Sequence, residues 1–302
     1  MRKYFSQDIL KWVLLFILTL TWGTSFILIK KGVEYFHPMQ VGALRITIAG
    51  LFLLPFGLVN LKYIPKKTIP WLILSGFLSN FLPMFLFPLA EVKISSSLAG
   101  ILNSLVPIFV VIIGYFVFKI KSNRFQIIGT ILGFLGAFLL IYFSNNHSSH
   151  TNSDSNFIYI SFILLATISY AFSGLITKKY LNEIPSFKLS TVVFTFLFLP
   201  SLLMLLFNDF YAEFQSVNLT KNALIGLGYV SILAIFGTAI AMILFYKLIQ
   251  ISSTVFAASV TYIMPIVAIC WGIIDGESLK FNHFAGMAII LTGVYMIQFK
   301  KK

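Results

Sequence analysis

Ten long runs of apolar residues, separated by short polar or charged segments, dominate the sequence. They cover residues 12–29, 39–59, 69–90, 96–118, 125–143, 157–177, 187–207, 222–246, 254–274 and 282–299. Most runs have about 20 residues, the length of α-helix that crosses the hydrocarbon core of a bilayer. Within them, apolar and polar residues do not alternate as they would in the strands of a membrane β-barrel. The pattern predicts an all-α membrane protein with ten transmembrane helices.

The composition agrees with this prediction and excludes a water-soluble globule. Of the 302 residues, 59% are hydrophobic and 10% are charged, and the mean hydropathy is +0.94. The net charge of +13 would suggest a nucleic-acid partner in a soluble protein. In a membrane protein, however, excess Lys and Arg belong to cytoplasmic loops. We therefore expect a lipid bilayer around the chain and no nucleic-acid partner.

Basic residues are distributed unequally between the two sides of the ten predicted spans. Of the 22 Lys and Arg residues, Arg45 lies inside a span and sixteen share the side of the N-terminus; the other five are Lys30, Lys31, Lys93, Lys221 and Lys280. Lys and Arg concentrate in cytoplasmic loops. Because an even number of spans puts both termini on one side, the sequence predicts a multi-pass protein of the cell (inner) membrane with both termini in the cytoplasm.

The two halves of the sequence resemble each other. A polar linker at residues 144–156 separates residues 1–143 from residues 157–302. TLTWGTSFILIKK, which begins at Thr19, aligns without gaps on TISYAFSGLITKK, which begins at Thr167. SSSLAGILNSLVPI, which begins at Ser95, aligns on STVFAASVTYIMPI, which begins at Ser253. The sequence therefore predicts two repeats of five helices each.

An odd number of spans in each repeat means that the two repeats enter the membrane in opposite directions. Inverted repeats of this kind are related by a pseudo-two-fold axis in the membrane plane, and they support outward-facing and inward-facing states around a central site. The predicted architecture is therefore that of a transporter that works by alternating access.

Several short motifs resemble the drug/metabolite transporter superfamily, specifically its EamA type. They are W-G-T-S-F at residues 22–26, the H-P-x-x-x-x-x-L-R run that ends at Arg45, Gly237-Thr238-Ala239 with Tyr246, Thr261-Tyr262 ahead of Pro265, and Gly276-Glu277. The resemblance implies a ten-helix exporter or facilitator of small metabolites, often amino acids. One departure is that Ile120 stands where the family pattern has an acidic residue before the fifth helix.

Polar side chains inside the predicted spans are the candidates for a substrate cavity, because a polar group that faces lipid costs free energy. These candidates are Trp22, Thr24, Ser25, Asn80, Asn103, Ser104, Tyr170, Ser173, Thr238, Tyr246, Thr261 and Tyr262. The alternative is that they only bond neighbouring helices, at about 1 kcal/mol or less each.

Five further residues inside the spans carry separate expectations. Arg45 is either a structural anchor or a contact for an anionic substrate group. Pro107 and Pro265 occupy matched positions in the two repeats, and each removes a backbone donor, so we expect helix breaks there. Gly129 and Gly133 form G-x-x-x-G, a spacing that permits close packing within one chain or in a homodimer.

Other classes of function lack the residues that they require. All nine acidic residues and the four histidines fall in loops or at helix ends, so no catalytic set converges in the membrane, as an enzyme acting on a lipid-linked substrate would need. His147 and His150 lie in the polar linker, which favours solvation over a metal site, and we expect no metal and no cofactor. A receptor or assembly factor that does not transport would need no inverted repeat. We therefore expect a transporter of small metabolites, with efflux favoured.

Overall fold

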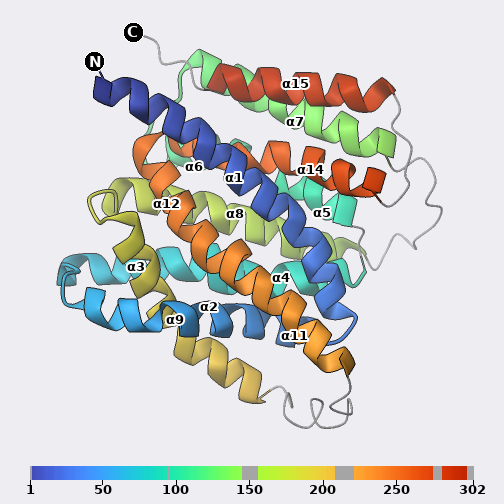
Figure 1. Ribbon diagram of the computed structural model, residues 1–302. Helices are drawn as coiled ribbons and strands as arrows, with labels where there is room; N and C mark the ends of the chain where they lie inside the picture. The colour runs from blue at the N-terminus through green and yellow to red at the C-terminus, as the bar shows by residue number, and fades with distance from the viewer. Residues whose placement is uncertain (1, 94–95, 145–155, 208–220, 275–280, 298–302) are drawn as a thin grey trace.

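The computed structural model describes residues 2–93, 96–144, 156–207, 221–274 and 281–297, and every regular element in these ranges is a helix. The helices form one bundle in which α1 begins at the end where α15 finishes (Figure 1). In the first half of the sequence they are α1 (Arg2–Val33), α2 (Pro38–Leu61), η1 (Lys66–Thr68), α3 (Ile69–Gly76), η2 (Phe77–Phe81), α4 (Leu82–Glu91), α5 (Ser96–Asn103), α6 (Val106–Phe116) and α7 (Arg124–Ser144). In the second half they are α8 (Asn156–Tyr180), α9 (Ser186–Phe207), α11 (Lys221–Ala234), η3 (Ile235–Ile240), α12 (Ala241–Ile251), α13 (Thr254–Ala258), α14 (Val260–Ile274) and α15 (Phe281–Ile297).

The lengths and compositions of these helices suit a bilayer. Among the described residues, six helical stretches are long and apolar enough to cross a membrane: Gln7–Val33, Pro38–Leu61, Lys66–Glu91, Phe157–Tyr180, Ser186–Phe207 and Leu224–Ile251. Shorter apolar helices cover Val106–Phe116, Arg124–Leu139, Thr254–Val267 and Ala285–Ile297. The predicted all-α membrane class is confirmed. Most of the 144–156 linker, with His147 and His150, and the Gly276-Glu277 motif lie outside the described residues.

Two of the long stretches contain a π-helical turn. In the first half, η2 joins α3 to α4, and in the second half η3 joins α11 to α12. A π-helical turn widens the helix locally and releases backbone groups from the regular ladder, and such turns are frequent at functional sites. Phe77 and Ile235, which begin the two turns, are separated by the same interval as Ser95 and Ser253 in the sequence alignment.

Two of the predicted spans are divided into two helices. A turn at Ser104 and Leu105 separates α5 from α6, and Pro107 stands in the first turn of α6, where its missing N–H costs nothing. In the second half the division lies at Ser259, between α13 and α14, while Pro265 lies inside α14. The helix continues through Pro265, so the interruption precedes the position expected from the sequence.

Glycine residues allow α7 and α15 to pack closely. A Cβ atom on Gly129 of α7 would lie 2.5 Å from the carbonyl oxygen of Gly293 in α15, and one on Gly293 would lie 2.6 Å from the amide nitrogen of Gly133. The two backbones therefore meet without side chains between them, as small residues permit at membrane depth. The G-x-x-x-G face of α7 is thus occupied by α15 of the same chain.

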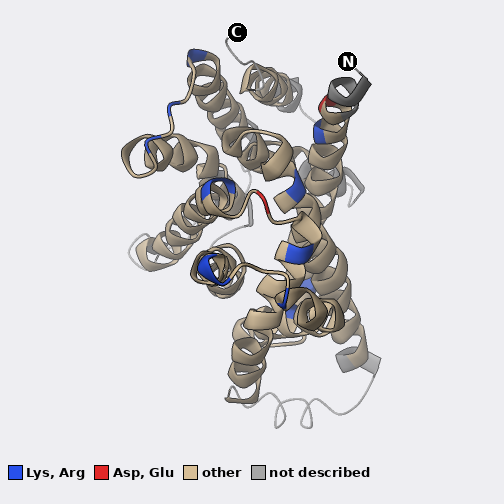
Figure 2. Cartoon of the chain, turned by 90° about the vertical axis from the view of Figure 1, so that its left-hand side faces the viewer, with Lys and Arg blue, Asp and Glu red and all other residues tan. Residues whose placement is uncertain are grey.

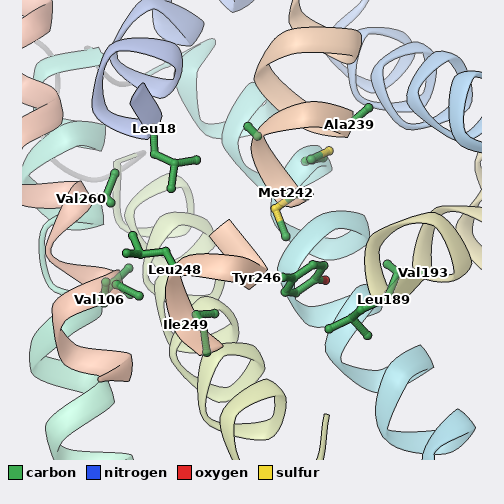
Figure 3. Packing of buried hydrophobic residues seen from close by; sticks show 14 of the residues in the cluster. Leu18, Val106, Leu189, Val193, Ala239, Met242, Tyr246, Leu248, Ile249 and Val260 are labelled. Atoms are coloured by element: carbon green, nitrogen blue, oxygen red, sulfur yellow. The ribbon is translucent and has the colours of Figure 1, made fainter. Parts of the chain in front are cut away.

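Side chains from both halves also meet in the apolar core. Leu18 of α1 and Val106 of α6 are buried in one cluster with Met242, Tyr246 and Leu248 of α12 (Figure 3). Because these contacts join residues distant in sequence, neither half buries its apolar faces alone.

Charged residues gather at one end of the bundle. The view in Figure 2 looks onto this end, and it shows many Lys and Arg positions in and around the loops, with few Asp and Glu positions. One acidic residue, Glu183, lies in the connection between α8 and α9. We refer to this as the basic end of the bundle.

Candidate substrate cavity

A cavity of about 110 Å³ lies among helices from both halves of the chain. This volume is several times the roughly 10–15 Å³ needed for one water molecule. The lining residues belong to α1, α2, η2, α4, α5 and α6 in the first half and to α8, η3, α12, α13 and α14 in the second half. They are Trp22, Ser25, Phe26, Ile29, Arg45, Ser79, Pro83, Met84, Phe87, Asn103, Val106, Val110, Tyr170, Gly174, Gly237, Met242, Phe245, Thr254, Ala257, Ala258, Val260, Thr261 and Met264.

Five of the twelve polar cavity candidates line this cavity, and so does Arg45. The five are Trp22, Ser25, Asn103, Tyr170 and Thr261. They come from four different helices, α1, α5, α8 and α14. The fold therefore brings polar groups from distant parts of the sequence to one space.

Arg45 is held in the cavity wall by the second half of the chain. Its Nε donates a hydrogen bond of 2.6 Å to Oγ1 of Thr238, and its Nη2 lies 3.4 Å from the carbonyl oxygen of Gly237. The same carbonyl accepts a 3.0 Å hydrogen bond from Nε1 of Trp22. Gly237 and Thr238 belong to the π-helical turn η3, which thus supplies acceptors to α1 and α2. Arg45 itself lines the cavity.

Asn103 presents an acceptor to the same space. The residue is only 5% exposed, and its Oδ1 atom has no hydrogen-bond partner among the residues that the structure describes. A buried polar atom that lacks a partner costs about 1–3 kcal/mol. A ligand that donates a hydrogen bond to Asn103 would remove this cost.

The other seven candidates lie near the cavity wall without lining it. Thr24 is half-buried on α1, Ser104 is buried in the turn between α5 and α6, and Thr238 holds Arg45. Asn80 and Tyr246 both lie beside Ser79: Nδ2 of Asn80 donates to Oγ of Ser79 at 2.7 Å, and the Tyr246 hydroxyl is 3.4 Å from the same atom.

Ser173 and Tyr262 join helices to each other. Oγ of Ser173 is 2.9 Å from Oγ of Ser75, which is also 2.8 Å from Oγ1 of Thr177, so these hydroxyls tie α3 to α8. The Tyr262 hydroxyl donates to the carbonyl oxygen of Thr130 at 2.8 Å and ties α14 to α7. For these residues the structure shows helix bonding, which was the alternative considered from the sequence.

Most side chains of the cavity wall are apolar. No group of three or more His, Cys, Asp or Glu side chains in these ranges is placed to hold a metal ion. The cavity wall combines one cation, a few uncharged hydrogen-bonding groups and many apolar and aromatic side chains. A wall of this kind suits a small amphipathic molecule with a polar end.

Comparison with known sequences matches both halves of the chain. The sequence profile of the EamA-like transporter family matches residues 10–142 and, a second time, residues 157–299. The chain belongs to the EamA-like transporter family. With helices suited to crossing a bilayer, this EamA-like protein is a multi-pass membrane transporter, as the motifs in the sequence suggested.

Individual relatives of this EamA-like transporter align over nearly its whole length. An uncharacterized transporter of Archaeoglobus fulgidus is 24% identical, covering 96% of this chain and 99% of that protein. The uncharacterized inner membrane transporter YedA of Escherichia coli is 24% identical, covering 95% and 90%. A Salmonella typhimurium protein named "probable amino-acid metabolite efflux pump" is 25% identical, covering 93% and 92%. One crystal structure superposes with a TM-score of 0.71 at 16% identity, covering 94% of each chain, and supports the fold alone.

Several residues of the EamA-like cavity were not nominated from the sequence. Most are apolar or aromatic, such as Phe26, Phe87 and Phe245, and nothing distinguishes an apolar cavity residue from a packing residue in a sequence with 33 Phe. Ser79 and Thr254 are the polar residues among them. Ser79 lies next to Asn80, which was nominated, and Thr254 is the first residue of α13.

Hydrogen bonds close the connection around Ile120, the residue that departs from the EamA pattern. Ile120 lies in the connection between α6 and α7, where Lys119 adopts a positive φ of 57°. The Ile120 amide donates to the carbonyl oxygen of Gly114 at 2.8 Å, and Asn123 caps α7 by accepting from the Gln126 amide at 2.8 Å. Backbone and amide hydrogen bonds therefore close this connection without an acidic side chain.

Proposed function

We propose that this protein moves small metabolites, amino acids among them, across the inner membrane by alternating access, and that it acts as an exporter. The observation that carries the proposal is the cavity shared by the two halves, in which Arg45 supplies a cation and Asn103 an unpaired acceptor. The carboxylate of an amino acid would bind to Arg45, and its ammonium group would donate a hydrogen bond to Asn103. The printed names of the E. coli and Salmonella relatives support an inner-membrane location, an amino-acid substrate and efflux.

The proposed architecture is ten transmembrane helices in two inverted repeats, residues 1–143 and 157–302, joined by the linker at 144–156. Paired features of the two halves support it. The π-helical turns η2 and η3 interrupt corresponding stretches of the two halves, and Asn80 and Thr238 take the same place in them. Repeats of this kind rock about a central site and expose it to each side in turn. A homodimer would have to use a surface other than the glycine face of α7.

Counterflow in liposomes tests transport and the site together. We expect the purified protein to exchange labelled amino acids saturably. Asn103→Leu should weaken this exchange about tenfold, because a hydrogen bond to a charged ammonium contributes about 1.5–3 kcal/mol. The matched control is Thr292→Val on α15, where an exposed hydroxyl bonds only to its own helix. An absence of exchange by folded wild-type protein would refute the amino-acid proposal, and equal effects of the two variants would refute the site.

Topology tests the orientation separately. We propose that the basic end faces the cytoplasm, because Lys and Arg gather there and cytoplasmic loops are rich in both. A reporter active only in the cytoplasm should therefore work when fused after Lys302, and it should fail when inserted into the 144–156 linker. The reverse pattern would invert the proposed orientation, and activity at both positions would contradict the odd number of spans between them.

A further inference from the structure

A pair of lysines converges on one tyrosine at the basic end of the bundle. Nζ of Lys62 lies 5.0 Å from the centroid of the Tyr63 ring, and Nζ of Lys188 lies 4.4 Å from it. Lys62 follows the last residue of α2, and Lys188 is in the first turn of α9. Two ammonium groups are thus brought to the same ring by two different helices. The ring face attracts each cation but neutralises neither.

The packing of α2 against α9 fixes this convergence. A Cβ atom on Gly57 would lie 2.6 Å from the carbonyl oxygen of Thr191, so the two backbones are in close contact about one helical turn from each lysine. Nδ2 of Asn60 donates to Oγ1 of Thr191 at 3.0 Å. The pair of lysines is therefore held by a rigid helix interface and does not depend on a flexible loop.

No acidic side chain compensates the two lysines. Within the described part of the chain, the ion pairs are Lys11 with Asp8 and Lys31 with Glu34, so neither Lys62 nor Lys188 has a carboxylate partner within ion-pairing distance. The exposed residues Lys66 and Lys67 follow in η1 and add to the positive charge of this corner. The corner is thus complementary to a compact anionic group.

An apolar stripe runs along α2 away from this corner. Phe52, Phe56 and Val59 are 45%, 50% and 57% exposed, and with Tyr63 they follow the spacing that places residues on one face of a helix. Phe187 of α9 packs edge-to-face on Phe56, with ring centroids 5.6 Å apart. The anionic group that fits the lysines would therefore carry an apolar chain that lies along the stripe.

We propose that Lys62, Tyr63 and Lys188, with the stripe Phe52, Phe56 and Val59, form a binding site for an anionic phospholipid. The phosphate lies between the two ammonium groups, and one acyl chain follows α2 toward the middle of the membrane. Basic clusters beside membrane-spanning helices attract anionic lipids by this chemistry. The site is on the outer surface of the bundle, and it does not depend on what the cavity transports.

Native mass spectrometry of the purified protein with added lipid tests this site. Phosphatidylglycerol should remain bound to the wild type more than phosphatidylcholine with the same acyl chains. Lys62→Gln combined with Lys188→Gln should weaken phosphatidylglycerol binding about 25-fold, at about fivefold for each lysine near an anionic headgroup. Lys62→Arg combined with Lys188→Arg should retain binding.

The matched control removes the same charge elsewhere at the basic end. Lys121→Gln combined with Arg124→Gln changes two exposed basic residues, one just before α7 and one at its start. It should change binding less than about twofold, since the headgroup site is intact. Inorganic phosphate at the same concentration should not displace the lipid, because it lacks the acyl chain. Equal weakening by both double variants, equal retention of the two lipids by the wild type, or displacement by phosphate would overturn the proposal.

Discussion

Replacing Gly129 with valine is expected to prevent the stable packing of α7 on α15. A Cβ atom at this position would lie 2.5 Å from the Gly293 carbonyl oxygen and 2.9 Å from the Ile297 amide nitrogen. Both atoms belong to a helix backbone that cannot turn aside as a side chain could, so the two helices must separate. Overpacking of this kind costs about 3 kcal/mol or more. Fluorescence-detected size-exclusion chromatography with heating should show little folded protein and a lowered Tm.

Gly228 provides the control for this substitution. It lies in α11, and no atom comes within 4 Å of the position that its Cβ would take. Gly228→Val introduces the same side chain into a helix, so the change in helix propensity is the same. Its Cβ atom, however, contacts no neighbouring atom. This variant should fold as the wild type does. If Gly129→Val and Gly228→Val lowered the Tm equally, helix propensity and not the α7–α15 contact would explain the effect.

Replacing Arg45 with methionine is expected to abolish most exchange of carboxylate substrates while leaving the fold intact. Hydrogen bonds to charged groups contribute about 1.5–3 kcal/mol, which corresponds to a loss of about tenfold to a hundredfold in affinity. Methionine fills much of the space of the side chain, and the groups to which Arg45 donates, the Thr238 hydroxyl and the Gly237 carbonyl, are uncharged. The measurement is inhibition of counterflow by an amino acid and by its amide, in which an uncharged carboxamide replaces the carboxylate, compared in wild type and variant.

The comparison between acid and amide separates binding from structure. If Arg45 contacts the carboxylate, the variant should lose affinity for the acid and keep its affinity for the amide. Thr238→Val removes the acceptor of the Nε hydrogen bond but retains the guanidinium, so it should weaken acid binding less than Arg45→Met does. Equal loss for acid and amide would show that Arg45 acts as an anchor between α2 and η3, the alternative raised from the sequence.

The helical membrane fold could be predicted from the sequence because a membrane-spanning helix needs an apolar run of about 20 residues. Such runs are easily recognised in the sequence. The π-helical turns did not follow, since the choice between α and π hydrogen bonding at Asn80 and Thr238 depends on packing against other helices and changes no residue type. The interruption at Ser259 was missed for a related reason. Pro265 marks a position that lacks a backbone donor, but the helix is interrupted six residues earlier, at Ser259, beside the cavity.

The cavity was predictable only in its polar part. Polarity within a span identified Asn103 and Arg45, because such groups avoid lipid. The same criterion selected Ser173 and Tyr262, which avoid lipid by bonding to neighbouring helices. A hydroxyl group is kept away from lipid both when it lines a cavity and when it bonds to a neighbouring helix. The sequence therefore could not distinguish cavity-lining residues from helix-bonding residues. The apolar residues that line the cavity, including Phe87 and Phe245, cannot be distinguished in the sequence from apolar residues that pack between helices.

The pairing of α7 with α15 has a consequence for synthesis of the chain. Ribosomes add roughly 5–20 residues per second. Gly293 is therefore synthesised on the order of ten to thirty seconds after Gly129. α14, which precedes α15 in the sequence, contacts α7 through Tyr262, but the part of the α7 surface around Gly129 lacks its partner until α15 is made. A nascent chain that ends before Phe281 would keep that surface open, and because small residues at this spacing also pair helices of separate chains, such fragments would associate with one another in the membrane.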